Sequence, residues 1–404
     1  MRSDGASSCH DLARLFERLG PARRRLAARD DRLIAAQIAL CEIPAPTGSE
    51  TARGACVARL FSELALDVRT DEVGNVVGVR EGDEDVEPVV VCAHLDTIFP
   101  DGTAITVERD GRQLSGPGIV DNSRGLAAML AVAESIDGHS LRTRRPIVFA
   151  ATVGEEGSGD LRGVRHLFES FDRAPASCIA LDGAGDERIV TRALGARRCR
   201  ITYRGEGGHS WASFGVPNPV HAAGAAAARL ASVPLPRTPR TTLSVCRIGG
   251  GISINAIPCE AWLEVDVRSS SPSVLNRCMS EMEAAARAAL REENSRRAPS
   301  TTLLSFVIDV IGDRPCGELD VEHPLVQAAI QATSFIGRTA ELATASTDAN
   351  VPISLGVPAI AIGAGGRGGG VHTPDEWYDN TDGSLGVARA LTLIVAAAEL
   401  AAAD

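Results

Sequence analysis

The sequence predicts an α/β fold, with a mostly parallel sheet interrupted by a smaller inserted α+β domain. Apolar runs that suit strands alternate with runs that suit helices through the first half of the chain, which is typical of a parallel sheet flanked by helices. Near residue 193 the runs change to strands in which apolar and polar residues alternate, which favours an antiparallel sheet with one solvated face. A continuous apolar run returns at 357–363.

Short apolar runs mark the elements of the main domain. Strands are predicted at NVVGVR, EPVVVCA, RPIVFAAT and SCIALD, and helices at RGLAAMLAVAESI and LRGVRHLFESF. The apolar run VARALTLIVAAAEL near the end of the chain is shorter than the roughly 18 residues that span a bilayer, so we expect a packed helix there. Residues 1–192 and 312–404 therefore form one discontinuous domain.

The inserted domain is expected at residues 193–311. Its strands are predicted at RRCRITYRG, TTLSVCRI, CEAWLEVDVRS and LLSFVIDVI, and its long helices at HAAGAAAARLAS and VLNRCMSEMEAAARAALREEN. The length also favours more than one domain, because 404 residues is well above the roughly 150 residues of a typical domain.

Charge and cysteine usage exclude several classes of function. The net charge of -11, from 41 Lys and Arg against 52 Asp and Glu, disfavours binding to nucleic acid or to anionic membranes. The basic stretch at 12–31 lacks the apolar core of a signal peptide. The ten cysteines include no CxxC pair, which favours reduced thiols over disulfides or a zinc finger. We expect a cytoplasmic protein with no nucleic-acid or membrane partner.

Histidines and carboxylates cluster where the predicted strands end. These residues are His94 and Asp96 after PVVVCA, Glu155 and Glu156 after IVFAATV, Asp182 after CIAL, His372 after PAIAIG and its glycine loop, and Asp121 in the glycine-rich GPGIVDNSRG. The carboxyl ends of strands in an open α/β sheet share one edge, so residues far apart in the chain can converge there.

This residue set suits borderline divalent ions such as zinc, manganese or cobalt. Five protein ligands exceed what one catalytic zinc with an open position takes, so we expect two ions joined by a bridging carboxylate, roughly 3.5–4 Å apart. Asp96 suits a supporting role, in which it accepts the second imidazole N–H of His94. One of Glu155 and Glu156 would bind metal while the other acts as general base.

Six ordered motifs carry a family resemblance: HLDT, GPGIVDNSRG, GEEGSGD, IALDG, GGHS and GGGVHTPDEW. Over nearly its whole length the chain resembles the M20 metallopeptidase family, which includes aminoacylases, di- and tripeptidases and deacylases. The resemblance implies one ion held by His94, Asp121 and Asp182, and another held by Asp121, Glu156 and His372. Glu155 would then be the general base that activates a metal-bridging water, and Asp96 would support the site.

The resemblance also assigns roles to the two domains. The discontinuous domain would be catalytic, and the inserted one would be a lid that forms a homodimer. His209 in GEGGHSWASFG is similar to a histidine that steadies the oxyanion, in its own or the partner's site. Asn255 and Arg268 are similar to groups that grip a substrate carboxylate, for which a guanidinium is well suited.

The expected function is a two-metal hydrolase, most simply a zinc enzyme, that cleaves an amide bond in a small peptide or N-acyl amino acid. Asp182 stands where many deacylases carry Glu and is similar to the di- and tripeptidase branch, which favours a small peptide or an aminoacyl amide as the substrate and leaves peptidase and deacylase activity both open. Two alternatives stay open. One is a hydrolase of a non-peptide amide such as a carbamoyl or ureido compound, and the other is a metal-binding relative without catalytic activity.

Overall fold

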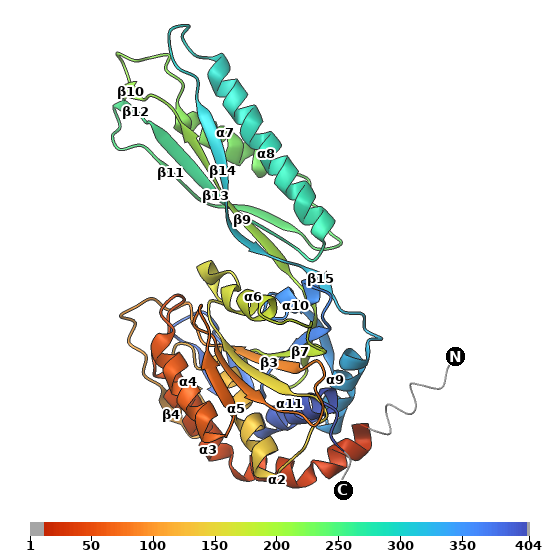
Figure 1. Ribbon diagram of the computed structural model, residues 1–404. Helices are drawn as coiled ribbons and strands as arrows, with labels where there is room; N and C mark the ends of the chain where they lie inside the picture. The colour runs from red at the N-terminus through yellow and green to blue at the C-terminus, as the bar shows by residue number, and fades with distance from the viewer. Residues whose placement is uncertain (1–11, 402–404) are drawn as a thin grey trace, which may run out of the picture. The chain divides into compact units, whose positions relative to one another are not determined.

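The computed structural model describes residues 12–401 and divides into two compact units (Figure 1). The first comprises Met1–Ala193 and Glu318–Asp404, and the second is Leu194–Gly317. The second unit extends past residue 311, where the predicted insert ended, because strand β14 (Ser305–Arg314) continues beyond that point. The catalytic, lid and dimerisation roles assigned to these units stay predictions.

Within the described residues, the first unit contains a nine-stranded sheet in the order β1-β2-β6-β3-β7-β17-β8-β15, with β16 paired to β8. The strands are β1 (Asp67–Thr70), β2 (Val76–Arg80), β3 (Val89–His94), β6 (Ile147–Thr152), β7 (Ser177–Leu181), β8 (Arg188–Ala193), β15 (Gly317–Glu318), β16 (Glu341–Ala345) and β17 (Ala359–Ile362). Strands β6, β3, β7 and β17 are mutually parallel, whereas β2 pairs antiparallel with β6 and β8 antiparallel with β17. The predicted α/β class with a mainly parallel central sheet is confirmed.

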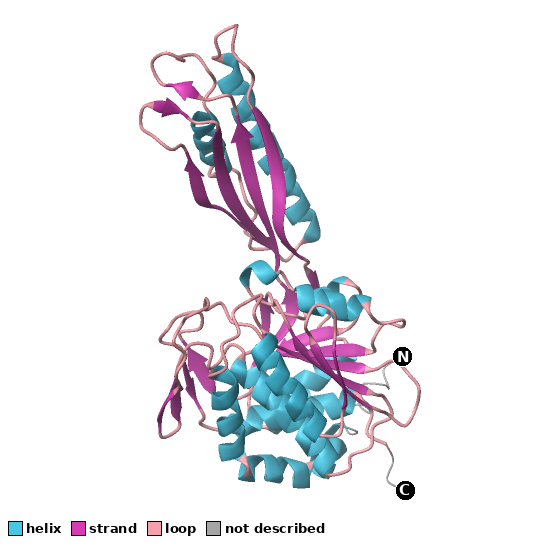
Figure 2. Cartoon of the chain, turned by 60° about the vertical axis from the view of Figure 1, so that its left-hand side comes forward, coloured by secondary structure: helices cyan, strands magenta, loops and turns pink. Residues whose placement is uncertain are grey.

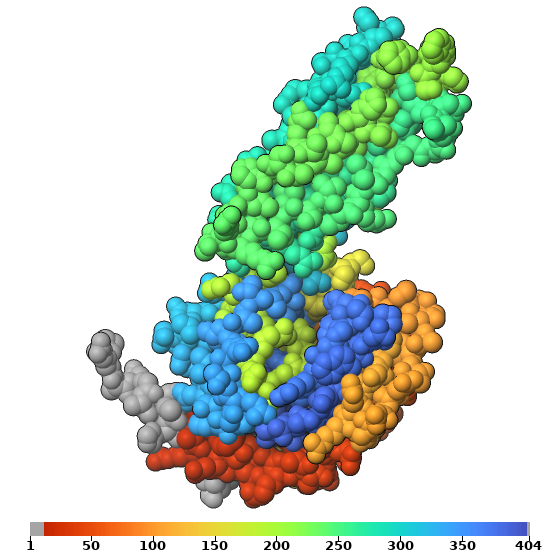
Figure 3. All heavy atoms as spheres, turned by 180° about the vertical axis from the view of Figure 1, so that it is seen from behind, coloured from red at the N-terminus to blue at the C-terminus, as the bar shows by residue number. Residues whose placement is uncertain are grey.

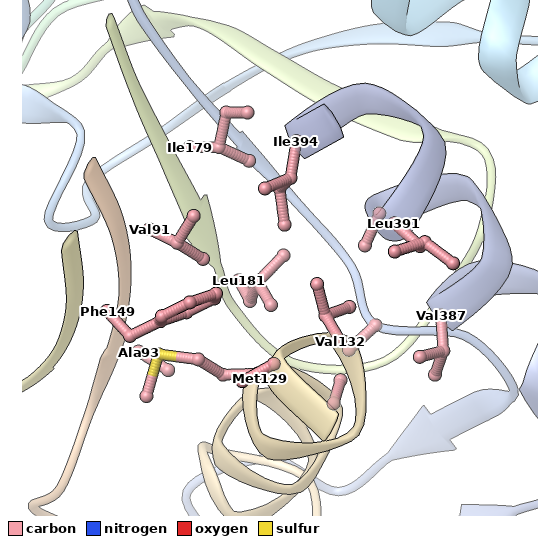
Figure 4. Close-up of a cluster of buried hydrophobic side chains, with 14 of the residues drawn as sticks. Val91, Ala93, Met129, Val132, Phe149, Ile179, Leu181, Val387, Leu391 and Ile394 are labelled. Atoms are coloured by element: carbon pink, nitrogen blue, oxygen red, sulfur yellow. The ribbon is translucent and has the colours of Figure 1, made fainter. Parts of the chain in front are cut away.

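Helices cover both faces of this sheet, which explains why its central strands are apolar throughout. The helices are α2 (Gly20–Ala28), α3 (Asp30–Cys41), α4 (Thr51–Glu63), α5 (Ser123–Gly138), α6 (Arg162–Glu169), α9 (Pro324–Phe335), α10 (Asn350–Ser354) and α11 (Gly383–Ala397), with a 3₁₀ turn at Gly157–Gly159. Val91 and Ala93 pack with α5 and α11 (Figure 4), while the alternate residues Val90 and Cys92 pack with α6 and α10. In the space-filling view, the N-terminal helices lie along one side of this unit (Figure 3).

A small four-stranded sheet, which the sequence did not predict, stands next to two of the candidate ligand loops. Its order is β18-β19-β5-β4, made of β4 (Glu108–Asp110), β5 (Gln113–Ser115), β18 (Arg367–Gly369) and β19 (Trp377–Asp379). Strand β5 leads into the loop that carries Asp121, and β18 and β19 flank the loop that carries His372. The β19–β5 pairing therefore joins these two loops.

The second unit is an antiparallel sheet with two helices packed on one face (Figure 2). It is built from β9 (Gly195–Arg204), β11 (Thr242–Gly250), β13 (Glu260–Ser269) and β14 in the order β11-β13-β9-β14, with α7 (Pro219–Leu230), α8 (Pro272–Ser295) and a short ribbon of β10 (Gly208–His209) and β12 (Ala256–Ile257). Buried residues alternate along β13, as its sequence period predicts.

Two further observations concern the whole described chain. The cysteines within residues 12–401 are free thiols, as expected. None of the helices described here combines the length and the apolar character that crossing a membrane requires.

Candidate metal centre

The predicted residues lie at or just after the carboxyl ends of the parallel strands, at one edge of the sheet. His94 is the last residue of β3, and in the β3–β6 register it lies opposite Thr152, three residues before Glu155. His94, Glu155 and Glu156 are all buried, at 2%, 4% and 7% exposure, whereas His372 is exposed, so among these four side chains solvent reaches the group only from the His372 side. Nearby, Asp121 precedes helix α5, which begins at Ser123.

The structure brings His94, Asp121 and Glu156 into one group, with one ligand atom from each within 4.8 Å of the others. His94 Nε2 lies 2.9 Å from Asp121 Oδ1, and His372 Nε2 lies 3.3 Å from Asp121 Oδ2. His372 Nε2 is also 2.7 Å from Glu156 Oε1. Asp121 thus presents one carboxylate oxygen to each histidine, which is the arrangement that a bridging ligand needs.

The residues present fit a divalent cation. Asp121 Oδ1 is buried and, within residues 12–401, has no hydrogen bond of regular geometry, although His94 Nε2 is 2.9 Å away. A buried carboxylate oxygen left without a partner is costly, and a cation would satisfy it. Imidazole nitrogens and carboxylate oxygens together are the ligands of zinc and of similar ions. His94, Asp121 and Glu156 would hold such an ion, with His372 alongside.

Electrostatics within the cluster follow from these distances. Burial lowers the pKa of His94, but the Asp121 and Asp96 carboxylates outweigh it and raise that pKa well above its usual value. Asp121 and Glu156 raise the pKa of His372 to about 10. Burial raises the pKa of Asp121, but His372 and His94 outweigh it and hold that pKa well below its usual range. A metal cation bound here would replace the imidazole protons that these carboxylates favour.

Asp182 follows β7 and stands beside this group, outside the tight set of three. Burial and the nearby Asp121 charge raise the pKa of Asp182 to about 6. The Asn122 side chain links the two aspartate loops, since its Nδ2 donates to Leu181 O at 2.9 Å and its Oδ1 accepts from Gly183 N at 3.1 Å. Asn122 is therefore hydrogen bonded to the backbone on both sides of Asp182.

Asp96 has different partners from those predicted. His94 Nδ1 is hydrogen bonded to the backbone carbonyl of Asp96 at 3.0 Å, whereas the Asp96 carboxylate lies 3.6 Å from that nitrogen. The carboxylate instead accepts the backbone N–H groups of Glu155 and Glu156, each at 2.9 Å, and the Thr47 hydroxyl at 2.8 Å. Burial raises the pKa of Asp96, but His94 and the two N–H donors bring it down to about 2. Asp96 therefore holds the turn that carries both glutamates.

Other charged residues that support the site were missed at the level of sequence. Arg53 is fully buried and donates to the carbonyl oxygens of Leu95 (2.8 Å) and Ile43 (2.8 Å), which fixes the segment between His94 and Asp96. Glu50 accepts from Gly154 N at 3.0 Å and pairs with Arg162 at 2.9 Å. These residues lie in no motif and in no apolar period, so no sequence signal singled them out.

The remaining candidate residues belong to the second unit. His209 lies in β10, where its Nδ1 accepts the backbone N–H groups of Trp211 (3.2 Å) and Ala212 (3.4 Å). Asn255 is exposed, and its Oδ1 accepts from the Ser253 hydroxyl at 2.6 Å. Arg268 lies in β13 and pairs with Asp266 at 2.8 Å. Their predicted roles toward the metal cluster stay predictions.

Comparison with known proteins places these observations in a family. The family model described as peptidase family M20/M25/M40 matches residues 90–396. The chain is 26% identical over 371 residues to the uncharacterized protein YqjE of Bacillus subtilis, covering 86% of this chain and 93% of that protein.

Solved structures share the fold across both units. A tripeptidase from Staphylococcus aureus superposes with a TM-score of 0.75 at 22% identity, covering 91% of this chain and 98% of that one. The YXEP protein of Bacillus subtilis, described as a dinuclear metal binding peptidase, gives a TM-score of 0.67 at 18% identity, covering 92% and 98%.

Proposed function

The chain belongs to peptidase family M20/M25/M40 and is a hydrolytic enzyme of that family, and from this premise we propose that it is a two-metal hydrolase of small peptides or N-acyl amino acids. One observation carries the proposal. Asp121 presents Oδ1 to His94 at 2.9 Å and Oδ2 to His372 at 3.3 Å, so a single carboxylate stands between two imidazoles. This arrangement suits a carboxylate shared by two cations.

In this proposal His94, Asp121 and Asp182 hold one ion, and Asp121, Glu156 and His372 hold the other. Zinc is the ion we propose, and manganese or cobalt would suit the same ligands. Bound there, the ions would polarise the scissile carbonyl and lower the pKa of the attacking water.

Glu155 is the proposed general base. Its neighbour Glu156 contacts His372, and Asp96 accepts the backbone N–H groups of both glutamates, which supports different roles for the two side chains. At 4% exposure Glu155 is shielded from bulk solvent. Its carboxylate would take a proton from the attacking water and later pass it to the leaving amine.

The second unit would supply substrate contacts. We propose that His209 stabilises the oxyanion, and that Asn255 and Arg268 bind a substrate carboxylate, for which Arg268 would exchange its present partner Asp266. A homodimer formed through this unit and a cytoplasmic location complete the proposal. The substrate is proposed to be a dipeptide, a tripeptide or an N-acyl amino acid.

A substrate panel combined with metal analysis of the same preparation tests this proposal. Purified protein is assayed with dipeptides, tripeptides, N-acyl amino acids and ureido compounds, with and without added zinc, manganese or cobalt. Hydrolysis confined to ureido compounds would reassign the substrate class, and no hydrolysis by a fully metal-loaded sample would point to a binding protein.

Glu155→Gln then tests the mechanism in the same assay. We expect it to keep its metal and to lose about 10²–10⁴-fold in turnover, because the amide cannot accept the proton. Glu169→Gln, an exposed change on α6, is the matched control and should behave as the unmodified protein. A Glu155→Gln enzyme with most of its activity would remove Glu155 from the base role.

A further inference from the structure

Glu376 is a fully buried carboxylate whose partners are the backbone of the Asp121 loop. Its Oε1 accepts the N–H groups of Val120 at 2.7 Å and Asp121 at 2.8 Å, and its Oε2 accepts the N–H of Gly118 at 3.0 Å. One side chain thus binds three donors within four consecutive residues, and the last of these donors belongs to the proposed bridging ligand.

The backbone of Glu376 is held in the same place by a second set of bonds. Its carbonyl accepts the N–H of Gly116 at 2.9 Å, and the adjoining pairs Trp377–Ser115 and Tyr378–Leu114 of the β19–β5 ladder fix the register. These bonds involve the main chain, so they fix the position of the Glu376 backbone. That position determines which N–H groups the side-chain carboxylate can reach.

The loop itself leaves little room for an alternative path. Gly118 adopts a φ of +79°, and a Cβ there would lie 2.9 Å from Thr97 Cγ2, so this position requires glycine. The Ser123 hydroxyl donates to Gly118 O at 2.7 Å. The loop is thus tightly constrained, and Glu376 satisfies N–H groups that would otherwise be buried without partners.

Glu376 also lies four residues after His372, on the loop that supplies the other ligand. A single short segment therefore carries the His372 imidazole and at the same time binds the backbone of Asp121.

We infer that Glu376 is a positioning residue, which sets the direction of the Asp121 carboxylate so that it faces His94 and His372 at once. This inference rests on the proposed metal site. Glu376 touches neither the ligand atoms nor, in the proposed mechanism, the substrate, and it acts through the backbone N–H groups of the 118–121 loop. Residues that orient ligands in this way commonly change metal affinity by about 10- to 100-fold when they are replaced.

Glu376→Gln tests the inference, because the amide keeps the size of the side chain but turns one acceptor into a donor. The amide NH₂ would face at least one of the three backbone N–H groups, which frees the loop at that point. We expect zinc affinity, measured by competition with a chelator, to fall about 10- to 100-fold. The visible absorption of the cobalt-loaded protein should also change, since that spectrum reports ligand geometry.

Glu293→Gln is the matched control. Glu293 is also a buried glutamate that accepts a backbone N–H, that of Asn218 at 2.8 Å, but it lies in the second unit. This variant should lower the thermal unfolding midpoint and leave zinc affinity and the cobalt spectrum unchanged. A general loss of stability would move the midpoint in both variants, whereas a positioning role changes the metal readouts only in Glu376→Gln.

The outcomes separate the inference from the function on which it rests. If the unmodified protein binds no zinc or cobalt, the proposed function fails. If it binds them and Glu376→Gln binds them with the same affinity and spectrum, the positioning role alone is overturned. Should Glu376→Gln not fold, Glu376→Asp replaces it, since it keeps the charge but shortens the reach. Weakened affinity in that variant supports the inference, and wild-type affinity or failure to fold overturns it.

Discussion

His94 Nε2 and Asp121 Oδ1 lie 2.9 Å apart, yet within residues 12–401 this buried oxygen makes no hydrogen bond of regular geometry. The two atoms are therefore close to one another without the alignment of a hydrogen bond. This geometry is expected of two ligands of one cation. A cation bound between the two atoms would give this buried oxygen a partner of opposite charge.

Asp121→Asn should therefore affect both proposed ions. The carboxamide offers one neutral oxygen where the carboxylate offers two charged ones, so it cannot bridge two cations. We expect metal content after dialysis to fall from two ions per chain toward none, whereas Asp182→Asn should lose one ion preferentially. Elemental analysis of both variants measures the difference. Equal losses in the two variants would contradict the bridging role of Asp121.

The pKa of His372 predicts how the metal-free protein depends on pH. Asp121 and Glu156 raise this pKa from 6.5 to about 10, so the imidazolium stabilises the folded state. A group with a raised folded-state pKa contributes all of its stability below its unfolded value and loses it as the pH rises. The free energy of unfolding of chelator-treated protein should therefore decrease between pH 6.5 and about 10. Denaturant titrations across this range measure the slope, and His372→Gln should reduce it, with the remainder due to the raised pKa of His94.

Metal affinity should change with pH in the opposite sense. A metal needs the neutral imidazole, so binding releases the proton from His372 and becomes tighter as the pH rises. Calorimetry in buffers of different ionisation enthalpy measures the protons released. Zinc binding without proton release near neutral pH would exclude His372 as a ligand.

The convergence of His94 and Glu156 could be predicted from sequence because it follows from topology alone. Both residues come just after apolar runs, and parallel neighbouring strands present their carboxyl ends at one edge. The direction of an individual side chain does not follow from topology. His94 Nδ1 lies 3.0 Å from the backbone carbonyl oxygen of Asp96 and 3.6 Å from its carboxylate. No residue pattern encodes so small a difference in distance.

The supporting residues show a second limit. Glu376 and Arg53 are charged side chains in segments that look solvent-exposed, and their burial follows from packing between elements that are distant in sequence. Arg53 reaches the strand-end carbonyl of Leu95 only because α4 lies against β2 and the chain after β3. A charged residue that is fully buried and bonded to backbone atoms gives no periodic signal. Arg53 therefore could be found only from the structure, whereas Glu376 lies in the motif GGGVHTPDEW, which does not indicate its burial or its backbone partners.

Asp96→Asn should disturb both glutamates at once. The carboxamide keeps one acceptor, so its NH₂ would face the backbone N–H of Glu155 or of Glu156. We expect a stability loss of about 1–3 kcal/mol and a metal affinity reduced about 10- to 100-fold. Denaturant unfolding and chelator competition measure the two effects. Thr47→Val is the control, since it removes the third donor to Asp96 and leaves both glutamate contacts intact.

Asn122→Asp tests whether the link between the two aspartate loops depends on the amide. Asn122 is fully buried, donates to Leu181 O and accepts from Gly183 N and Gly125 N. A carboxylate keeps both acceptor contacts but sets an oxygen against the Leu181 carbonyl and adds charge beside Asp121. We expect the variant to be about 1–3 kcal/mol less stable at neutral pH and to bind metal more weakly.

The pH dependence of the stability of Asn122→Asp distinguishes the loss of the amide donor from a general packing defect. Repulsion from Leu181 O and Asp121 would raise the pKa of the new carboxyl, and the protonated form could donate to Leu181 O as the amide does. The difference in free energy of unfolding between Asn122→Asp and the unmodified protein should therefore decrease as the pH falls. Asn294→Asp is the matched control, because its amide bridges Leu304 N and O in the second unit, where the same change should leave metal affinity intact. If this difference in free energy of unfolding stays constant with pH, lost packing and not the lost donor destabilises the Asn122→Asp protein.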